Sequence, residues 1–276
     1  MFYWIVGILV SAVALYFLYR EVYFYEATHL GTRIQSWLYD GWAAKYDMDK
    51  QESQARDAEM LACPILDFIV NVHTPLILDI ATGTGRLPLA LLCEPEFKGH
   101  VVAVDVSTGM LNEAAQKLSA YHGRFMLVHK LNYPLPFPDG TFDVVSCLEA
   151  LEVMPEMETP LAELCRVLRP GGMLISSRGT DASGRSAKVR SVEVFKTVLQ
   201  GMGFEQVDII PWWRWFDRVT ARKPGEFSPA AGRSISDVLV CKNCRTTHFE
   251  IVPGAGLKCV KCGNKIPQNA EGVLLL

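Results

Sequence analysis

The sequence lacks a surplus of basic residues, with 27 Lys and Arg against 30 Asp and Glu for a formal net charge of −3. This balance gives no reason to expect a global nucleic-acid binder, although local basic patches stay open. Internal repeats and long low-complexity tracts are also missing. Because half of the 276 residues are hydrophobic and 21% are charged, we expect one large folded domain plus a small appendage, with no extended disorder.

Charge is absent from the first nineteen residues, Met1–Tyr19, whose helix would be roughly 28 Å long, close to the thickness of a bilayer core. Aromatic residues gather at both ends, as in an interfacial belt. A signal peptide would need a basic segment first, and a buried core helix would need an amphipathic pattern. We therefore predict a transmembrane anchor over residues 1–20. Every Lys and Arg follows it, so the positive-inside rule predicts a single-pass protein in contact with the bilayer and with a cytoplasmic body.

Four of the eight cysteines lie outside one C-terminal group. The isolated ones lie in apolar or helical contexts typical of packed free thiols: Cys63, Cys93, Cys147 and Cys165. The others form the pattern C-x2-C-x14-C-x2-C: Cys241, Cys244, Cys259 and Cys262. Four thiolates suit tetrahedral zinc with no open position, so we expect a structural zinc ribbon in a reducing compartment; a redox dithiol is the alternative. Neighbouring Lys and Arg residues either offset the charge of the site or contact an acidic partner such as RNA.

A glycine turn follows a short apolar run, but two familiar nucleotide signatures are incomplete in "PLILDIATGTGRLPLALL". Pro88 stands where a dinucleotide fingerprint has its third glycine, and no G-K-[ST] follows the turn. Asp79, just before the turn, would repel a pyrophosphate and attract a cationic ligand. These features favour S-adenosylmethionine, which has an ammonium and a sulfonium but no phosphate. Asp105 can accept both ribose hydroxyls, or it can act as a turn residue before the next helix.

Short apolar runs alternate with helical patterns, which predicts a doubly wound α/β fold with a mostly parallel sheet. Five strands are expected near Leu76–Ile80, Val101–Val106, Phe125–His129, Phe142–Cys147 and Met173–Ser177. Two closing strands are expected in "GFEQVDIIPWW" and "WFDRVTARKP", which makes a seven-stranded sheet. Helices are expected near Leu87–Cys93, Gly109–Tyr121, Thr159–Leu168 and Val192–Met202, with earlier helical segments over 22–42 and 52–72.

Several motifs, taken in order, resemble the class I S-adenosylmethionine-dependent methyltransferases, which have a Rossmann-like fold. They are "ILDIATGTGRL", "VVAVDVSTGML", "LPFPDGTFDVVSCLEALEVMPE" and "LAELCRVLRPGGMLISS". Upstream, "LYDGWAAKYD" resembles the entry motif of the quinone-biosynthesis-like branch, so the resemblance covers about Tyr39 to Arg222. It implies a cofactor site made of Tyr46, Asp79, Ala81, Gly83, Gly85, Asp105, Val106 and Asn132, with Tyr39 as an alternative lid residue to Tyr46. The family's adenine-facing Asp or Asn falls on Leu131, and Asn132 is one place late.

Three side chains are candidates for chemistry beyond cofactor binding. Glu149 and Glu152 follow the fourth expected strand and would share one face if that segment is helical. Quinone O-methyltransferases have E-x-x-E-H here, but Val153 replaces the histidine, which argues against a metal. The favoured interpretation is that one glutamate contacts the cofactor and the other is a solvated helix acid. His129, at the end of the third expected strand, either lies near the cofactor or is a packed histidine.

Taken together, these features predict an anchor (1–20), a juxtamembrane helix with the entry motif (21–51), a methyltransferase domain (52–222), a linker (223–236) and a zinc ribbon (237–276). The expected activity is methyl transfer to an unidentified acceptor, for which the anchor favours a membrane-soluble quinone or lipid. Two alternatives stay open. The chain could modify RNA or protein, with the ribbon as its recognition module, or it could bind the cofactor without catalysis as an assembly protein.

Overall fold

The computed structural model describes residues 2–183, 189–229 and 235–276 of the chain. The linker expected over 223–236 therefore lies partly outside the described residues. Seven α-helices occur in this part of the chain: α1 Phe2–Tyr23, α2 Thr32–Gln54, α3 Cys63–Phe68, α4 Arg86–Leu92, α5 Thr108–Lys117, α6 Glu158–Val167 and α7 Val192–Gly201.

The large sheet has the strand order β11-β3-β2-β1-β4-β5-β7-β6. Its strands are β1 Leu76–Ile80, β2 His100–Asp105, β3 Phe125–His129, β4 Phe142–Cys147, β5 Leu168–Gly179, β6 Glu205–Trp213, β7 Phe216–Arg222 and β11 Leu274–Leu275. All neighbours are parallel except that β7 runs antiparallel to β5 and β6. This confirms the Rossmann-like α/β fold with a mainly parallel sheet.

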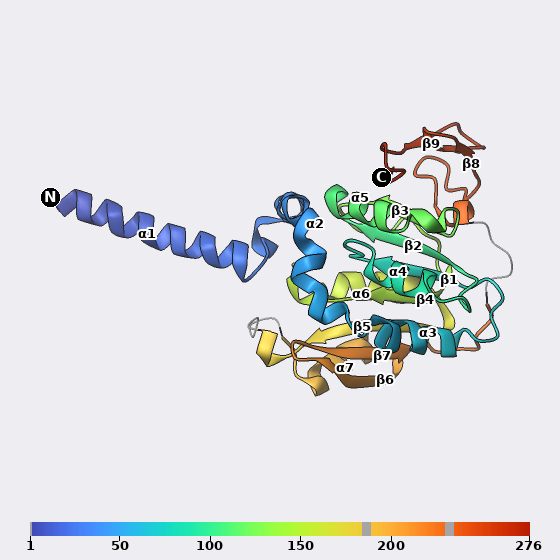
Figure 1. Cartoon of the computed structure of the whole chain (residues 1–276), viewed down its shortest axis with the longest axis horizontal. Helices are drawn as coiled ribbons and strands as arrows, with labels where there is room; N and C mark the ends of the chain where they lie inside the picture. Colours follow the sequence, from blue (N-terminus) through green and yellow to red (C-terminus); the bar gives the residue numbers. More distant parts are fainter. Residues whose placement is uncertain (1, 184–188, 230–234) are drawn as a thin grey trace.

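Alternate residues of the central strands enter two separate hydrophobic clusters, one on each face of the sheet. On β1, Leu76, Leu78 and Ile80 pack with α6 and α7, whereas Ile77 packs with α3, α4 and α5. A strand that is buried on both faces needs a continuous apolar run, and "LILDI" supplies one apart from Asp79. The helices therefore cover both faces, as a doubly wound sheet requires (Figure 1).

The expected count of seven strands is wrong, because the chain returns to the sheet at its C-terminal end. Leu274 and Leu275 pair in parallel with Val128 and His129 of β3 and form an eighth strand. A turn in which Gly272 N–H donates to Asn269 O (3.1 Å) redirects the chain toward β3. The added strand covers an edge whose backbone groups would otherwise lack partners.

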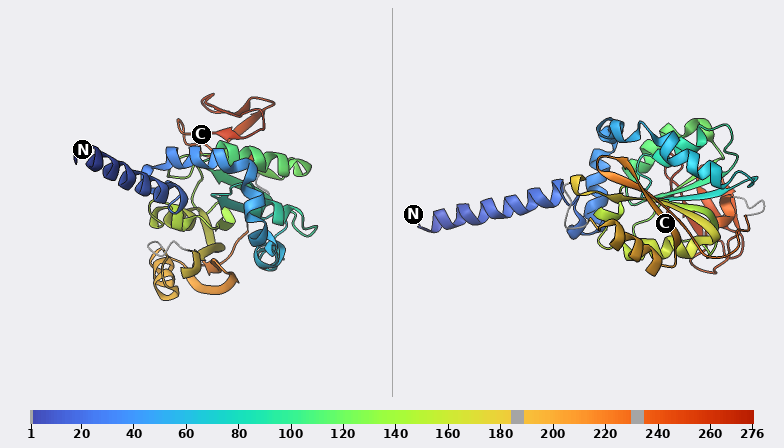
Figure 2. Two further views of the ribbon diagram at one scale, coloured as in Figure 1. Left: turned by 60° about the vertical axis from the view of Figure 1, so that its left-hand side comes forward. Right: turned by 90° about the horizontal axis from the view of Figure 1, so that it is seen from below.

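The cysteine-containing segment forms a second, three-stranded antiparallel sheet in the order β10-β9-β8. These strands are β8 Phe249–Val252, β9 Gly256–Cys259 and β10 Lys265–Pro267. The small sheet packs against the larger domain beside β3 and α5 (Figures 1 and 2), and its Phe249, Leu257 and Ile266 join the same buried cluster as β1 and α6. The two parts of the fold therefore share one hydrophobic core.

The N-terminal helix α1 projects away from the rest of the molecule (Figures 1 and 2). Its segment Tyr3–Tyr23 is long and apolar enough to cross a membrane, and none of its most apolar stretch is buried inside the protein. A tight elbow over residues 24–31 then leads into α2, with Glu26 and Ala27 in the left-handed region at φ 49° and 59°. Thus α1 is joined directly to the helix that carries the entry motif.

Candidate functional site

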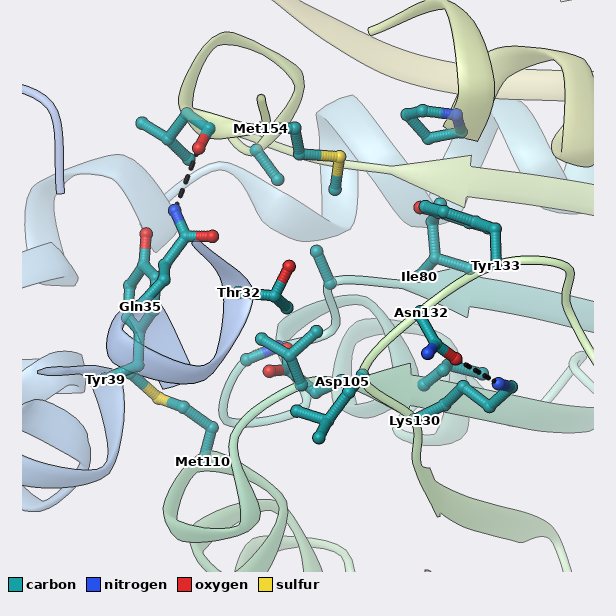
Figure 3. A pocket seen from close by; sticks show the side chains of 18 of the residues that line it. Thr32, Gln35, Tyr39, Ile80, Asp105, Met110, Lys130, Asn132, Tyr133 and Met154 are labelled. Carbon is teal, nitrogen blue, oxygen red and sulfur yellow. Dashed lines mark hydrogen bonds between the residues drawn. The ribbon is translucent and has the colours of Figure 1, made fainter. Parts of the chain in front are cut away.

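A cavity of about 260 Å³ opens at the carboxyl ends of β1, β2 and β4, between these strand ends and α2. Figure 3 shows Thr32, Gln35 and Tyr39 of α2 on one side, with Lys130, Asn132 and Tyr133 across from them. Parallel sheets bind ligands at this edge, because the chain reverses there and leaves a crevice outside the strand ends. The volume lies near the lower end of small-molecule sites, about 300–1,000 Å³.

Asp105 and the glycine turn form the floor of the cavity. One carboxylate oxygen of Asp105 accepts from Gly83 N–H at 2.8 Å and the other accepts from Ser107 N–H at 2.9 Å. Gly83 has φ 55°, the left-handed conformation that a tight turn around a carboxylate requires. Burial raises the pKa of Asp105 above its usual range, against the effect of these backbone donors. The carboxylate is therefore fixed in place, with its remaining lone pairs available to a ligand.

The predicted cofactor residues do not all reach the cavity. Five others besides Gly83 and Asp105 line it: Tyr39, Tyr46, Ala81, Val106 and Asn132. Asp79 lies behind the wall, where its carboxylate accepts from the Ser146 hydroxyl and from Thr82 Oγ1 (2.6 Å). Gly85 also lies outside the wall, packed against α5. In this structure Asp79 and Gly85 shape the turn, and their contact with the cofactor stays a prediction.

Burial raises the pKa of Asp79 to about 6, and the hydrogen bonds from Ser146 and Thr82 lower it only in part. The strand register explains the position, because Asp79 sits in the middle of the sheet, paired with Ala103 on β2 and Ser146 on β4. A cation bound above the turn would favour the ionised form.

The entry motif ties α2 to the strand ends through its two aspartates. Asp40 accepts from Ser107 Oγ at 2.6 Å and from Gly109 N–H at 2.7 Å, at the start of α5. Asp47 accepts from Thr84 Oγ1 at 2.6 Å and pairs with Lys117. The Tyr46 ring faces Gly83, within 3.9 Å of the position that a Cβ would occupy there. The helix thus lies over the glycine turn as a lid held at two points.

Glu149 lines the cavity and is part of a partly buried ion-pair network. Its two carboxylate oxygens contact Arg86 at 2.7 Å and Lys50 at 3.1 Å. Arg86 also pairs with Asp57 at 2.7 Å and stacks over Trp212 with its guanidinium 4.6 Å from the ring centroid. Sequence reasoning missed Arg86 and Lys50, because the network joins segments far apart in the chain. It leaves Glu149 held by two cations, unlike a free general base.

The other two catalytic candidates lie outside the cavity wall. Glu152 is buried, at 4% exposure, and burial raises its pKa to about 7. The solvated helix acid expected at one of the two glutamates is therefore wrong. Glu152 lies in a short turn over residues 151–153 that folds inward, and the Glu149 side chain is held in the ion-pair network. His129 Nε2 lies 3.0 Å from Val106 O, as in a packed histidine. None of the three side chains has a geometry that identifies it as a catalytic base.

Both Leu131 and Asn132 line the cavity, so the one-residue offset from the family pattern does not remove Asn132 from the site. The amide oxygen of Asn132 accepts from Lys130 Nζ at 2.8 Å. Burial lowers the pKa of Lys130. Among the described lining residues this lysine is the one cation, whereas Asp105, Glu149 and Glu156 are acidic. Because Arg86 and Lys50 already pair with Glu149, Asp105 is the buried carboxylate of the wall that is left to face a ligand.

The four grouped cysteines converge on one point, with their Sγ atoms all within 4.8 Å of one another. Across the site, the Sγ atoms of Cys241 and Cys262 lie 3.6 Å apart and those of Cys244 and Cys259 lie 3.5 Å apart. Zn–S bonds of about 2.3 Å in a tetrahedron give S–S separations of about 3.8 Å, so the donor set fits zinc. The two knuckles also repeat one backbone pattern, in which Arg245 N–H donates to Cys241 O and Gly263 N–H donates to Cys259 O, each at 2.9 Å.

The fold is Rossmann-like, and its cavity lies at the strand ends where such folds bind their ligands. Residues 77–172 match the family model described as a methyltransferase domain, which spans β1 to the first part of β5. Neither α1 nor the cysteine segment falls within the matched residues. The prediction of a methyltransferase is confirmed at the level of this domain.

Curated relatives of this chain include demethylmenaquinone methyltransferases. That of Symbiobacterium thermophilum is 31% identical over 167 residues, which cover 59% of this chain and 65% of that protein. That of Thermus thermophilus is 40% identical over 110 residues, which cover 40% of this chain and 50% of that protein. The chain thus spans about half to two thirds of the length of these two relatives.

Solved structures share the fold. A protein of Methanococcus maripaludis assigned as an S-adenosyl-L-methionine-dependent methyltransferase superposes with a TM-score of 0.55 at 20% identity, covering 68% of this chain and 94% of that one. The CurJ carbon methyltransferase superposes with a TM-score of 0.53 at 17% identity, covering 61% of this chain and 54% of that one. At these identities the likeness is one of fold.

Proposed function

We propose that the chain transfers a methyl group from S-adenosylmethionine to a quinone-type, lipid-soluble acceptor at a membrane surface. The observation that carries the proposal is the cavity itself. It is built at the strand ends of a methyltransferase domain, and its wall includes the helix that follows the apolar helix α1. The names of the curated relatives supply the quinone class of the acceptor.

The residues of the cavity fit S-adenosylmethionine. Asp105 would accept the ribose hydroxyls, Val106 would lie against the adenine, and Gly83 allows the methionine end to approach the backbone. When bound, the cofactor supplies an electrophilic methyl group on a sulfonium. The Asp105 carboxylate favours that positive charge, and Tyr46 of α2 lies over the glycine turn. Methyl transfer is an in-line displacement, so holding the two reactants in alignment supplies much of the acceleration.

The remaining wall is apolar enough to take a ring. The cavity wall has apolar side chains in residues 131–135 and in the segment after β4: Tyr133, Leu135, Val153, Met154 and Pro160. Aromatic and thioether side chains pack well against a planar, polarisable ligand. We infer that the acceptor ring binds on this side.

We further propose that α1 spans the bilayer and leaves the catalytic body on the cytoplasmic side. The helix has 22 residues, roughly 33 Å at 1.5 Å per residue, and its basic residue Arg20 lies in its last turn. The cysteine site would hold a structural zinc ion, because all four ligand positions are filled by thiolates. No described contact favours nucleic acid as the partner of the ribbon, where Lys258 pairs with Glu250 at 2.7 Å.

Incubation with S-adenosylmethionine labelled in its methyl group tests the proposal. Membranes would be fractionated into organic extract, protein and RNA after reaction with the purified full chain. We expect the label in the organic extract, in a component that behaves as a quinone-type lipid. Label in protein or RNA with none in the organic extract would refute the lipid acceptor.

A further inference from the structure

The start of α2 has an unusual distribution of polar and apolar side chains. Ile34 and Trp37, one turn apart, are 45% and 74% exposed, whereas the polar Gln35 and Ser36 between them are buried. A helix on the surface of a water-soluble domain normally does the reverse. The apolar face of this helix therefore points away from the protein core.

This exposed face continues the apolar surface of α1. Tyr23 at the end of α1, then Phe24 and Leu30 in the elbow, are also exposed. We call Tyr23, Phe24, Leu30, Ile34 and Trp37 the elbow surface. Tyrosine and tryptophan prefer the layer between lipid headgroups and acyl chains, since one part of each ring system is apolar and the other hydrogen-bonds. The elbow surface has that composition and lies within fourteen residues of a helix long enough to span a bilayer.

The elbow is fastened to the wall of the cavity by hydrogen bonds to one carbonyl. Thr28 Oγ1 and Gln35 Nε2 both donate to Val153 O, each at 2.8 Å. Val153 and the following Met154 line the cavity, and Figure 3 shows the bond from Gln35 beside Met154. The Tyr39 hydroxyl also donates to the Glu26 carboxylate. The elbow and this part of the wall therefore form one unit.

The cavity reaches the surface next to this unit. Among its lining residues, Asn132, Pro155 and Glu156 are exposed, and Thr32 and Met154 are half-buried. Thr32 is the first residue of α2, between Leu30 and Ile34 of the elbow surface. The part of the opening at Thr32 and residues 154–156 therefore borders the exposed apolar face.

We propose that the elbow surface lies in the interfacial layer of a phospholipid bilayer and sets this opening against it, so that the acceptor enters the cavity from the lipid phase. The bilayer is the occupant favoured by the direct continuity with α1. Because the elbow and the wall are bonded together, docking on the membrane also positions the wall. This inference rests on the proposed function for the nature of the acceptor, but the membrane contact itself does not depend on turnover.

Tryptophan quenching tests the membrane contact. The full chain is reconstituted in phosphatidylcholine vesicles that carry bromine atoms high on the acyl chains. The variant Trp4→Phe removes the reporter in α1, and Trp4→Phe/Trp37→Phe also removes the one in the elbow surface. We expect clear quenching in the single variant that is largely lost in the double variant. Equal quenching in both would place Trp37 outside the bilayer and overturn the proposal.

Kinetics then test the route of entry. The double variant Ile34→Glu/Trp37→Glu should raise KM for a long-chain quinone-type acceptor in vesicles by about fivefold or more, because it adds charge to an interfacial helix. KM for a short-chain, water-soluble analogue and Kd for S-adenosylmethionine should not change. Val70→Glu, at an exposed apolar position that belongs neither to the elbow surface nor to the cavity wall, is the matched control and should change neither.

An equal change for both acceptors, or no change for the vesicle-bound one, would overturn entry from the lipid phase. The two proposals fail in different ways. Quenching of Trp37 without methyl transfer to any quinone-type acceptor would refute the proposed function and leave the membrane surface standing. Transfer to the acceptor with no quenching of Trp37 would refute the membrane surface alone.

Discussion

The substitution Asp105→Asn should weaken S-adenosylmethionine binding while leaving the chain folded. Each oxygen of the Asp105 carboxylate accepts a backbone N–H, from Gly83 at 2.8 Å and from Ser107 at 2.9 Å, and the side chain faces the cavity. A hydrogen bond to a charged group contributes about 1.5–3 kcal/mol. Losing the charge that receives the ribose hydroxyls should therefore raise Kd roughly 10- to 150-fold.

The side-chain amide nitrogen that this substitution introduces would also face one of the two backbone N–H groups, at a cost of about 1–3 kcal/mol in stability. Removing a buried charge offsets part of that cost, since burial raises the pKa of Asp105. Titration calorimetry with S-adenosylmethionine and S-adenosylhomocysteine measures the affinity, and thermal unfolding without ligand checks the fold. The control is Asp139→Asn, which changes an exposed acidic residue outside the cavity. An affinity for Asp105→Asn equal to that of the control would refute the assignment of the ribose site.

Three further predictions concern stability. Burial raises the pKa of Glu152 from 4.5 to about 7, so the folded state binds the proton more tightly than the unfolded state, and stability falls as the pH rises from about 4.5 to 7. Glu152→Gln should flatten this slope in unfolding curves recorded across that pH range, and an unchanged slope would contradict the prediction. Arg86→Met removes the cation that pairs with Asp57 and leaves Glu149 paired with Lys50 alone. Urea unfolding should show a loss of roughly 3 kcal/mol in the free energy of unfolding, and a loss below about 1 kcal/mol would mean that the network contributes little. Removing metal with a strong chelator should release one zinc ion per chain and lower Tm of the whole chain, because the ribbon shares the core of the large sheet; metal-free protein with an unchanged Tm would contradict a structural role.

Much of the sheet could be predicted because its strands are short apolar runs buried on both faces. The structure gives β1, β3 and β4 the expected ends at Leu76–Ile80, Phe125–His129 and Phe142–Cys147. Strand β5 is expected near Met173–Ser177 but runs from Leu168 to Gly179. It begins earlier because it pairs with β4 beyond an irregularity between Phe142 and Val144, and it ends later because Arg178 and Gly179 pair with β7. Such an extension depends on the partner strand and has no local signal.

What depends on contacts between distant segments could not be predicted. Two leucines near the end of the chain carry no strand pattern of their own, and β11 exists because β3 offers a free edge. The network around Arg86 joins Lys50, Asp57 and Glu149, which lie far apart in the chain, and no spacing in the sequence predicts it. Asp79 precedes the glycine turn, which favours a direct ligand, but the sequence does not show that its side chain shares a face of the sheet with Ser146 on the neighbouring strand and accepts a hydrogen bond from it.

The most direct test of the central claim is a single reaction followed by mass spectrometry. The full chain in phosphatidylcholine vesicles would be given S-adenosylmethionine and a reduced quinone-type acceptor that lacks one ring methyl group. We predict that the acceptor gains the mass of one methyl substitution with the wild-type chain, and far more slowly with Asp105→Asn at the same cofactor concentration. An acceptor of unchanged mass, with S-adenosylmethionine bound but not consumed, would contradict the account.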